Sequence, residues 1–243
     1  LLPVPGRPMA LMSTSIFDTD TWKPRQMYVI ATDKPGAPRP VGPPGAFIES
    51  PPPGQGLRGP GIFSPDATWV LLRRTGDDTL LAVSVDGGEG VALGEATQAR
   101  RAWTSRDGRW VLFETPEGSD AVASLEPPGP GQPLPGRGGR FSTDGLTLAY
   151  LGLGDDQGAV FATEPLEFVP RRLTPPGLAA IAIAAVTPTE AIFRVRDDRD
   201  RGLFAVPLDG TGSPRPLTSA DDGDVLLVGV LGPVEGSDEG AAD

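Results

Sequence analysis

The sequence predicts an all-β fold made of five similar sheets, and three observations carry this prediction. Hydrophobic residues make up 38% of the 243 residues, and they occur in short alternating runs of strand length. The 33 glycines and 29 prolines lie mostly between these runs, where turns require them. A unit of roughly forty residues with four short strands also recurs along the chain. This period is typical of the blade of a β-propeller.

The first half of each unit contains a polar turn followed by an alternating apolar run. An apolar residue, small polar residues or proline, and an acid that can accept backbone N–H bonds make up the turn. The turn occurs at residues 63–66, 103–108 and 141–145, with a weaker version at 186–190. We therefore expect Asp66, Asp107 and Asp144 to be structural residues.

The second half of each unit has the pattern of a hairpin: a strand, a Gly/Pro/Asp turn and a short outer strand. These hairpins begin at Met27, Leu80, Ala121, Ala159 and Leu203. An apolar residue near the end of each hairpin marks the period, at Val41, Leu93, Leu134, Leu173 and Leu217. The successive intervals are 52, 41, 39 and 44 residues, which supports one blade per unit.

We predict a single β-propeller domain over residues 1–243 with five four-stranded blades; six or more blades is the alternative. The predicted blades are 9–42 together with 224–231, then 57–94, 98–136, 139–174 and 178–218. Residues 43–60 contain ten prolines and glycines, and we expect a surface insertion between blades because proline cannot donate to a central ladder. Residues 232–243 are expected to form an acidic flexible tail.

The predicted ring closes through the two ends of the chain. Met9–Ser15 has the pattern of a second strand, so the first unit lacks an inner strand of its own. Residues 224–231 follow Leu217 and Thr218 as an inner strand follows Leu173 and Thr174 in the preceding unit. We therefore expect 224–231 to pair beside Met9–Ser15, which would leave no open face between blades. In the alternative, the chain is part of a larger propeller whose other blades lie outside it.

The repeat resembles that of the TolB-like bacterial β-propellers, which combines W/F-S-P-D-G, a D-x-D-G turn and a final R-x-L-T. The closest matches are Phe63–Asp66, Phe141–Gly145, Leu208–Gly210 and Arg215–Thr218, and the resemblance covers about residues 9 to 231. The third unit departs from the pattern, since EPPGPGQP replaces the D-G turn. The resemblance implies a WD-repeat-like propeller outside the bacterial cytoplasm, in the periplasm or cell envelope. Such repeats occur in periplasmic scaffold proteins and in the non-catalytic propellers of prolyl-oligopeptidase-type enzymes.

Composition excludes several kinds of chemistry. The net charge of −11 disfavours binding to nucleic acid and to anionic lipid, because both are polyanions. The sequence has no run of eighteen apolar residues, so we predict no membrane insertion. With no histidine and no cysteine, the chain cannot contain a Ser-His-Asp triad, a thiolate nucleophile or a zinc site made of these ligands. The predicted inner strands at 178–186 and 224–231 have no acid in the middle, unlike a glycosidase cavity. We predict no catalytic residue, cofactor or metal.

Acidic loops are the candidate binding surface, since each loop between a second and a third predicted strand carries at least two acids. A ring of carboxylates would attract a basic segment of another protein, or calcium, whereas the structural alternative is that these acids merely suit solvated turns. Trp22 is the tryptophan expected to be exposed and to anchor a partner; Trp69, Trp103 and Trp110 are expected to pack. The candidate residues are Asp18, Asp20, Trp22, Asp77, Asp78, Glu117, Asp120, Asp155, Asp156, Asp197, Asp198 and Asp200.

These observations predict a non-enzymatic protein-interaction or scaffold module within a larger extracytoplasmic assembly. The alternative function is the accessory propeller of a prolyl-oligopeptidase-like hydrolase whose catalytic domain lies outside this chain.

Overall fold

A computed structural model describes residues 1–15, 24–48, 62–97, 102–196 and 201–218. These residues form five antiparallel sheets of four strands each, in an all-β architecture. Their one helix is the short 3-10 turn η2 (Gly154–Asp156). Nothing helical in the described ranges has the length and apolar character needed to cross a bilayer.

The strands of each sheet follow one another in the chain, as in propeller blades. The first sheet contains β1 (Leu2–Pro3), β2 (Met9–Ser15), β3 (Pro24–Ala31) and β4 (Arg39–Val41), and the second contains β5 (Ala46–Phe47), β6 (Trp69–Arg74), β7 (Thr79–Ser84) and β8 (Val91–Glu95). The third contains β9 (Trp103–Thr104), β10 (Trp110–Glu114), β11 (Asp120–Ser124) and β12 (Gln132–Pro133). The fourth contains β13 (Gly136–Phe141), β14 (Leu148–Gly152), β15 (Val160–Thr163) and β16 (Arg171–Arg172), and the fifth β17 (Ala180–Val186), β18 (Glu190–Arg196), β19 (Arg201–Pro207) and β20 (Arg215–Pro216).

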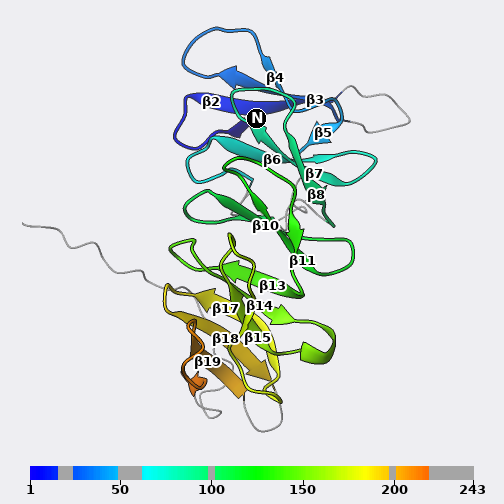
Figure 1. Cartoon of the computed structure of the whole chain (residues 1–243). Coiled ribbons are helices and arrows are strands. Elements are labelled where there is room, and N and C mark those ends of the chain that lie inside the picture. The colour runs from blue at the N-terminus through cyan, green and yellow to red at the C-terminus, as the bar shows by residue number, and fades with distance from the viewer. Residues whose placement is uncertain (16–23, 49–61, 98–101, 197–200, 219–243) are drawn as a thin grey trace, which may run out of the picture.

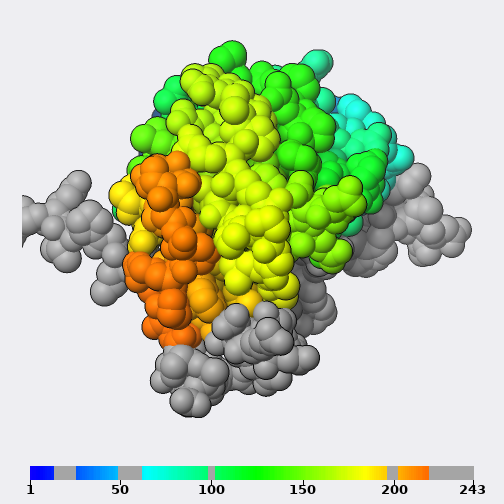
Figure 2. Space-filling model, turned by 60° about the horizontal axis from the view of Figure 1, so that its bottom comes forward, coloured from blue at the N-terminus to red at the C-terminus, as the bar shows by residue number. Residues whose placement is uncertain are grey.

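Neighbouring sheets pack face to face and enclose a hydrophobic cluster between them. Leu11 and Val29 of the first sheet pack on Leu72 of the second, and Leu151 of the fourth packs with Phe193 of the fifth. The space-filling view shows the fourth and fifth sheets as one continuously packed surface (Figure 2). The predicted all-β propeller with five four-stranded blades is confirmed.

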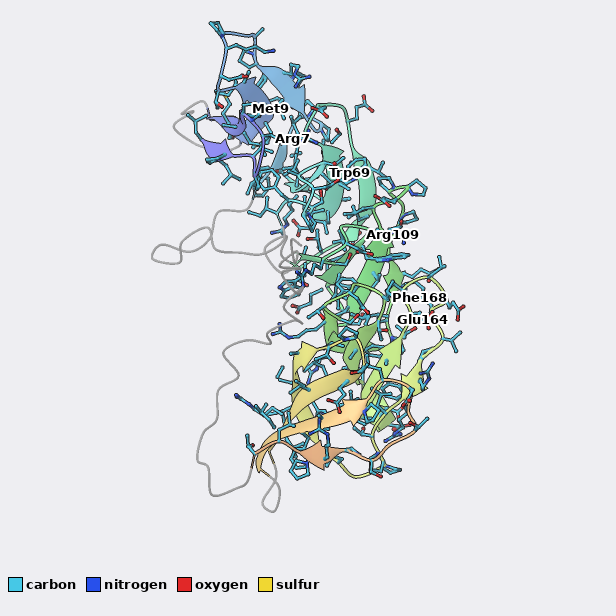
Figure 3. The ribbon with its side chains drawn as sticks, turned by 90° about the vertical axis from the view of Figure 1, so that its left-hand side faces the viewer. Arg7, Met9, Trp69, Arg109, Glu164 and Phe168 are labelled. Atoms are coloured by element: carbon cyan, nitrogen blue, oxygen red, sulfur yellow. The ribbon has the colours of Figure 1, made fainter. Side chains whose placement is uncertain are left out.

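The described residues form an open arc. Figure 1 shows the sheets following one another from the first at one end to the fifth at the other, and Figure 3 shows the arc from the side. None of the four hydrophobic clusters within the described residues joins the first sheet to the fifth. The predicted closing strand, residues 224–231, lies outside the described residues.

One part of the closure prediction is wrong, because the first sheet has an inner strand of its own. Pro3, at the end of β1, pairs with Ala10 of β2. Thr104, at the end of the inner strand of the third sheet, pairs with Val111 in the same register. The N–H of Val4 then donates to the carbonyl of Met9, at 2.9 Å, as the turn serines do in later sheets. Leu2–Pro3 thus occupies the position beside Ala10 and Leu11 of β2, which was assigned to residues 224–231. Two prolines and a glycine stand between Val4 and Met9 where later units have a serine–aspartate turn, so the sequence pattern did not show this repeat.

The Pro/Gly-rich insertion also differs from its prediction. It interrupts the inner strand of the second sheet instead of separating two sheets. Strand β5, Ala46–Phe47, pairs with Arg73 and Arg74 near the end of β6, whereas Phe63 pairs with Val70 near its start. Ala46 is fully buried, so its apolar side chain fixes this short strand in the core despite the neighbouring prolines. Of the predicted range 43–60, residues 49–60 lie outside the described part of the chain.

A buried serine organises the turn between the first and second strands in three sheets. Its Oγ accepts the N–H of the residue five positions later, at 2.9 to 3.0 Å, and donates to the aspartate two positions later, at 2.5 Å. The aspartate also accepts the backbone N–H that follows the turn. The three pairs are Ser64 with Asp66, Ser105 with Asp107, and Ser142 with Asp144. The structural role expected of these aspartates is confirmed, and Thr187 accepts the N–H of Glu190 in the corresponding turn of the fifth sheet.

Replacing Ser105 with alanine should lower the free energy of unfolding by about 2 kcal/mol, because the N–H of Trp110 and the carboxylate of Asp107 lose a buried partner. Chemical denaturation monitored by tryptophan fluorescence measures the change. The matched control is Ser213→Ala at an exposed position of the last turn, which should alter stability by less than about 0.5 kcal/mol. Equal effects of the two substitutions would contradict the role of the turn serine.

Candidate functional site

The predicted acidic surface is only partly within the described residues. Asp18, Asp20, Trp22, Asp197, Asp198 and Asp200 lie outside them. Three of the remaining acids are paired with arginines close by. Asp77 bonds to Arg74, Asp78 to Arg73 at 2.7 Å, and Asp156 to Arg172 at 2.7 Å.

These pairs reduce the negative potential of the loops. The hydrogen bonds from Arg74 hold the pKa of Asp77 well below its usual range, so that carboxylate stays ionised but is already partnered. Glu117 lies exposed in a turn and Asp155 in the first turn of η2. The described ranges bring no three acidic side chains together in a metal-binding group.

Asp120 does not belong to the surface predicted for it, since it is 4% exposed. One of its carboxylate oxygens accepts the N–H of Gly139 in β13, at 2.6 Å, and thereby joins the third sheet to the fourth. Burial raises the pKa of Asp120 to about 6, and the nearby charge of Glu114 adds to this increase. Asp120 is thus a structural link between two blades, because the first residue of β11 faces the neighbouring inner strand.

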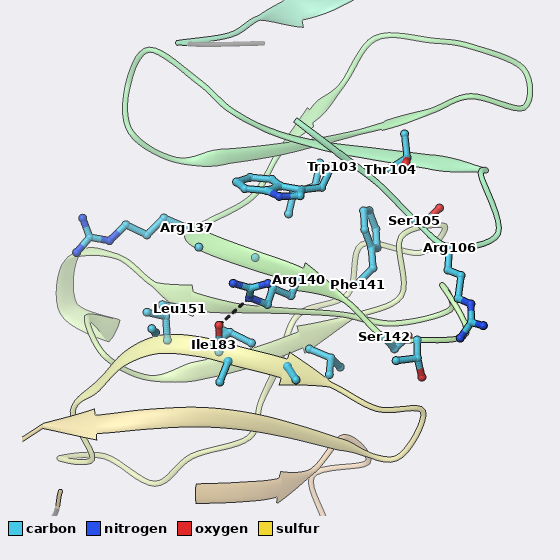
Figure 4. Close-up of a pocket in the computed structure, with 18 of the residues that line it drawn as sticks. Trp103, Thr104, Ser105, Arg106, Arg137, Arg140, Phe141, Ser142, Leu151 and Ile183 are labelled. Carbon is cyan, nitrogen blue, oxygen red and sulfur yellow. Dashed lines mark hydrogen bonds between the residues drawn. The ribbon is translucent and has the colours of Figure 1, made fainter. Parts of the chain in front are cut away.

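A hollow of about 1000 Å³ lies along the inner strands of the last three sheets. Strands β9, β13 and β17 supply most of its wall, and each is the innermost strand of its sheet. Its described lining contains Arg106, Arg137 and Arg140 but no aspartate or glutamate. Figure 4 shows Arg137 and Arg106 toward opposite ends, with Arg140 and Trp103 between them. The hollow is therefore cationic in a chain whose net charge is −11.

A β-bulge places two of these arginines on one face of β13. Arg137 pairs with Leu151 and Arg140 with Ala149, so three steps along β13 match two steps along β14. In a regular strand, residues three apart face opposite sides, whereas one extra residue brings both to the same side. Gly139 provides the bulge toward the third sheet, where a Cβ atom would lie 3.1 to 3.2 Å from Leu112 and Asp120.

The three arginines differ in how they are held. The Nε of Arg140 donates to the carbonyl oxygen of Ile183 in β17, at 2.8 Å, across the gap between the fourth and fifth sheets. Within the described residues, neither Arg106 nor Arg137 makes an ion pair, and both are exposed. Two guanidinium groups at the hollow are therefore available to an anionic group.

The expectation that Trp103 packs in the interior is wrong, because this residue is 37% exposed. It pairs with Leu112 at the inner edge of the third sheet and lines the hollow. Ile181 of β17, in the fifth sheet, is 48% exposed and lines the same hollow. Sequence reasoning missed this site; the signal available was the segment GRGGRF, in which two arginines flank two glycines.

The fold and the site together define a five-bladed β-propeller with a cationic inner hollow. No family model and no curated protein matches the chain. Among solved structures it is similar to one described as TolB from Agrobacterium tumefaciens, with 22% identity over 67% of this chain and 62% of the other and a TM-score of 0.47. It is also similar to TolB from Acinetobacter baumannii, with 14% identity, coverage of 76% and 50%, and a TM-score of 0.42. An oligogalacturonate lyase from Vibrio parahaemolyticus gives 12% identity, coverage of 86% and 59%, and a TM-score of 0.45.

The chain thus spans 62%, 50% and 59% of these three structures, which is less than two thirds of each. The sequence resembles TolB-like propellers, and two of these similar structures are described as TolB; the similarity is one of fold.

Substitution of Asp120 should change how stability depends on pH. The pKa of Asp120 is higher in the folded state, about 6, than the ordinary value of 3.8, so the folded protein binds this proton more tightly. Protonated Asp120 therefore adds to the free energy of unfolding, and this contribution is roughly 2 to 3 kcal/mol. It is fully present below about pH 4 and is lost as the pH rises to about 6.

Asp120→Asn keeps an acceptor for the N–H of Gly139 but cannot titrate, so the difference in unfolding free energy between it and the parent should vary between pH 4 and 6 and be constant above. Denaturation series at several pH values measure this difference. Asp120→Ala, which leaves the N–H without its acceptor, should be less stable than Asp120→Asn at every pH. A difference between parent and Asp120→Asn that stays constant from pH 4 to 6 would refute the assignment.

Proposed function

We propose that this propeller is a non-enzymatic protein-interaction module and that its inner hollow receives a segment of the partner protein. The observation that carries the proposal is the exposure of Trp103 in a hollow of about 1000 Å³. An exposed tryptophan beside apolar residues is the kind of side chain that anchors a partner, because burying it removes a large apolar area from water.

The hollow is better suited to binding than the acidic loops are. Most of its wall consists of strands held in sheets, so the backbone that carries these side chains is already in place and binding costs little ordering. In the loops, by contrast, Asp77, Asp78 and Asp156 are already bonded to arginines of their own sheets. A basic partner would have to compete with these intramolecular pairs.

The chemistry of the hollow favours recognition over catalysis. Its described lining offers guanidinium groups, aromatic rings, serine and threonine hydroxyls and aliphatic side chains. None of these is a general acid or base near neutral pH, and the lining holds no such group to activate a hydroxyl. We further propose that the module acts within a larger extracytoplasmic assembly, as the resemblance of its repeats to TolB-like propellers implies.

The proposal is tested by placing a photo-crosslinking amino acid at position 181, which lines the hollow and leaves Trp103 in place, in the cells that produce the chain. A partner protein should be captured from position 181, and mass spectrometry should identify the captured segment. The matched control carries the same amino acid at Lys34, an exposed residue between β3 and β4 of the first sheet. Capture of the same protein with equal yield at both positions, or of none at position 181, would count against the hollow as the binding site.

A further inference from the structure

We infer that the partner segment bound by the hollow is an extended acidic peptide, an inference that rests on the proposed function. Arg106 and Arg137 carry it, because both are exposed and neither makes an ion pair within the described residues. Guanidinium groups bind carboxylates through two parallel hydrogen bonds, which gives both strength and orientation.

The hollow and the chain as a whole carry opposite charge, and this difference makes the site selective for an acidic segment. The chain has a net charge of −11, so its surface as a whole repels an acidic peptide. The hollow is the reverse, with three arginines and no acid in its described lining. An acidic segment is therefore directed to the hollow and disfavoured over the rest of the surface.

The positions of the arginines fit an extended chain. Figure 4 shows Arg137 and Arg106 toward opposite ends of the hollow, so one compact anion cannot occupy both places. An extended peptide advances about 3.3 Å per residue, and a segment of several residues can present carboxylates at both ends. Arg140 lies between them, with its Nε already donating to Ile183.

The apolar residues favour a peptide over an acidic polysaccharide. Trp103, Phe141 and Ile181 line the hollow among the arginines, and the first and last of these are substantially exposed. A peptide of alternating acidic and apolar residues can meet both kinds of side chain, since successive side chains of an extended segment point to opposite sides. A polymer of uronic acids offers carboxylates and sugar faces but no aliphatic side chain for Ile181.

The inner strands also offer backbone groups to an extended segment. Strands β9, β13 and β17 each stand at the end of their sheet and, in the described part of the chain, pair on one side only. An extended peptide can bond to such an edge while its side chains occupy neighbouring pockets.

The experiment measures binding of three labelled peptides of one length to the whole protein by fluorescence anisotropy. The acidic probe is Glu-Leu-Glu-Ser-Glu-Leu-Glu, and the two comparison peptides replace every glutamate with glutamine or with lysine. Polygalacturonate is the fourth probe. We expect the acidic peptide to bind and to bind less tightly as salt concentration rises, because exposed charges are screened.

Substitutions locate the binding. Arg106→Gln and Arg137→Gln should each raise the Kd of the acidic peptide about five- to tenfold, and Trp103→Ala should raise it by a similar factor. Arg109→Gln is the matched control, because it removes the same charge from an exposed arginine on the outer side of the arc, where Arg109 pairs with Glu126 at 3.5 Å (Figure 3). Its Kd should stay within about twofold of the parent value.

Any of the following results would overturn the inference. Equal losses in Arg106→Gln, Arg137→Gln and Arg109→Gln would mean that the peptide responds only to net charge. Binding of the glutamine or lysine peptide without the acidic one, weakened by Trp103→Ala, would refute the acidic specificity while leaving the hollow as an interaction site. Binding of polygalacturonate alone would assign the hollow to a carbohydrate. No binding of any peptide would refute the inference as well, and the crosslinks from position 181 would then show separately whether the proposed function stands.

Discussion

The packing of each sheet on the next is the constraint on which the rest of the structure depends. A four-stranded sheet of this size cannot bury both faces alone, so each must find a neighbour for its apolar side chains. The four clusters between consecutive sheets meet this need, and the short connections keep the sheets in chain order. The buried serines set the start of the second strand in the second, third and fourth sheets and so keep these sheets in comparable register.

The same packing creates the site. When sheets stack in an arc, their innermost strands gather on the concave side, and side chains from three sheets come to share one hollow. The bulge at Gly139 then decides the chemistry of that hollow, because it brings Arg137 and Arg140 to one face. On the other side of the bulge, the N–H of Gly139 is held by Asp120 of the preceding sheet. One local irregularity thus links two sheets and orients the cations of the site.

Charged side chains are paired in the described acidic loops but largely unpaired at the hollow. Several acids of the described loops have arginines of their own sheet beside them, as Asp78 has Arg73 and Asp156 has Arg172. Of the arginines of the hollow, Arg137 and Arg140 come from β13, in a segment of glycine and phenylalanine, and Arg106 comes from the turn after β9; neither Arg106 nor Arg137 has an acidic partner in the described residues. A count of charges along the sequence therefore points to the loops, whereas the folded chain leaves cations unpaired inside the arc.

The sequence by itself determined the all-β class, the five repeats and the structural aspartates of the turns, because these depend on local patterns of alternation and turn chemistry. It placed Trp103 in a strand but could not show that this strand borders a hollow, and it treated Asp120 as a loop acid although the neighbouring sheet covers it. It also missed the inner strand at Leu2–Pro3, which two residues form only by pairing with β2. Tertiary structure decided these points, since exposure, pairing and the direction of a side chain at a bulge depend on segments distant in the chain.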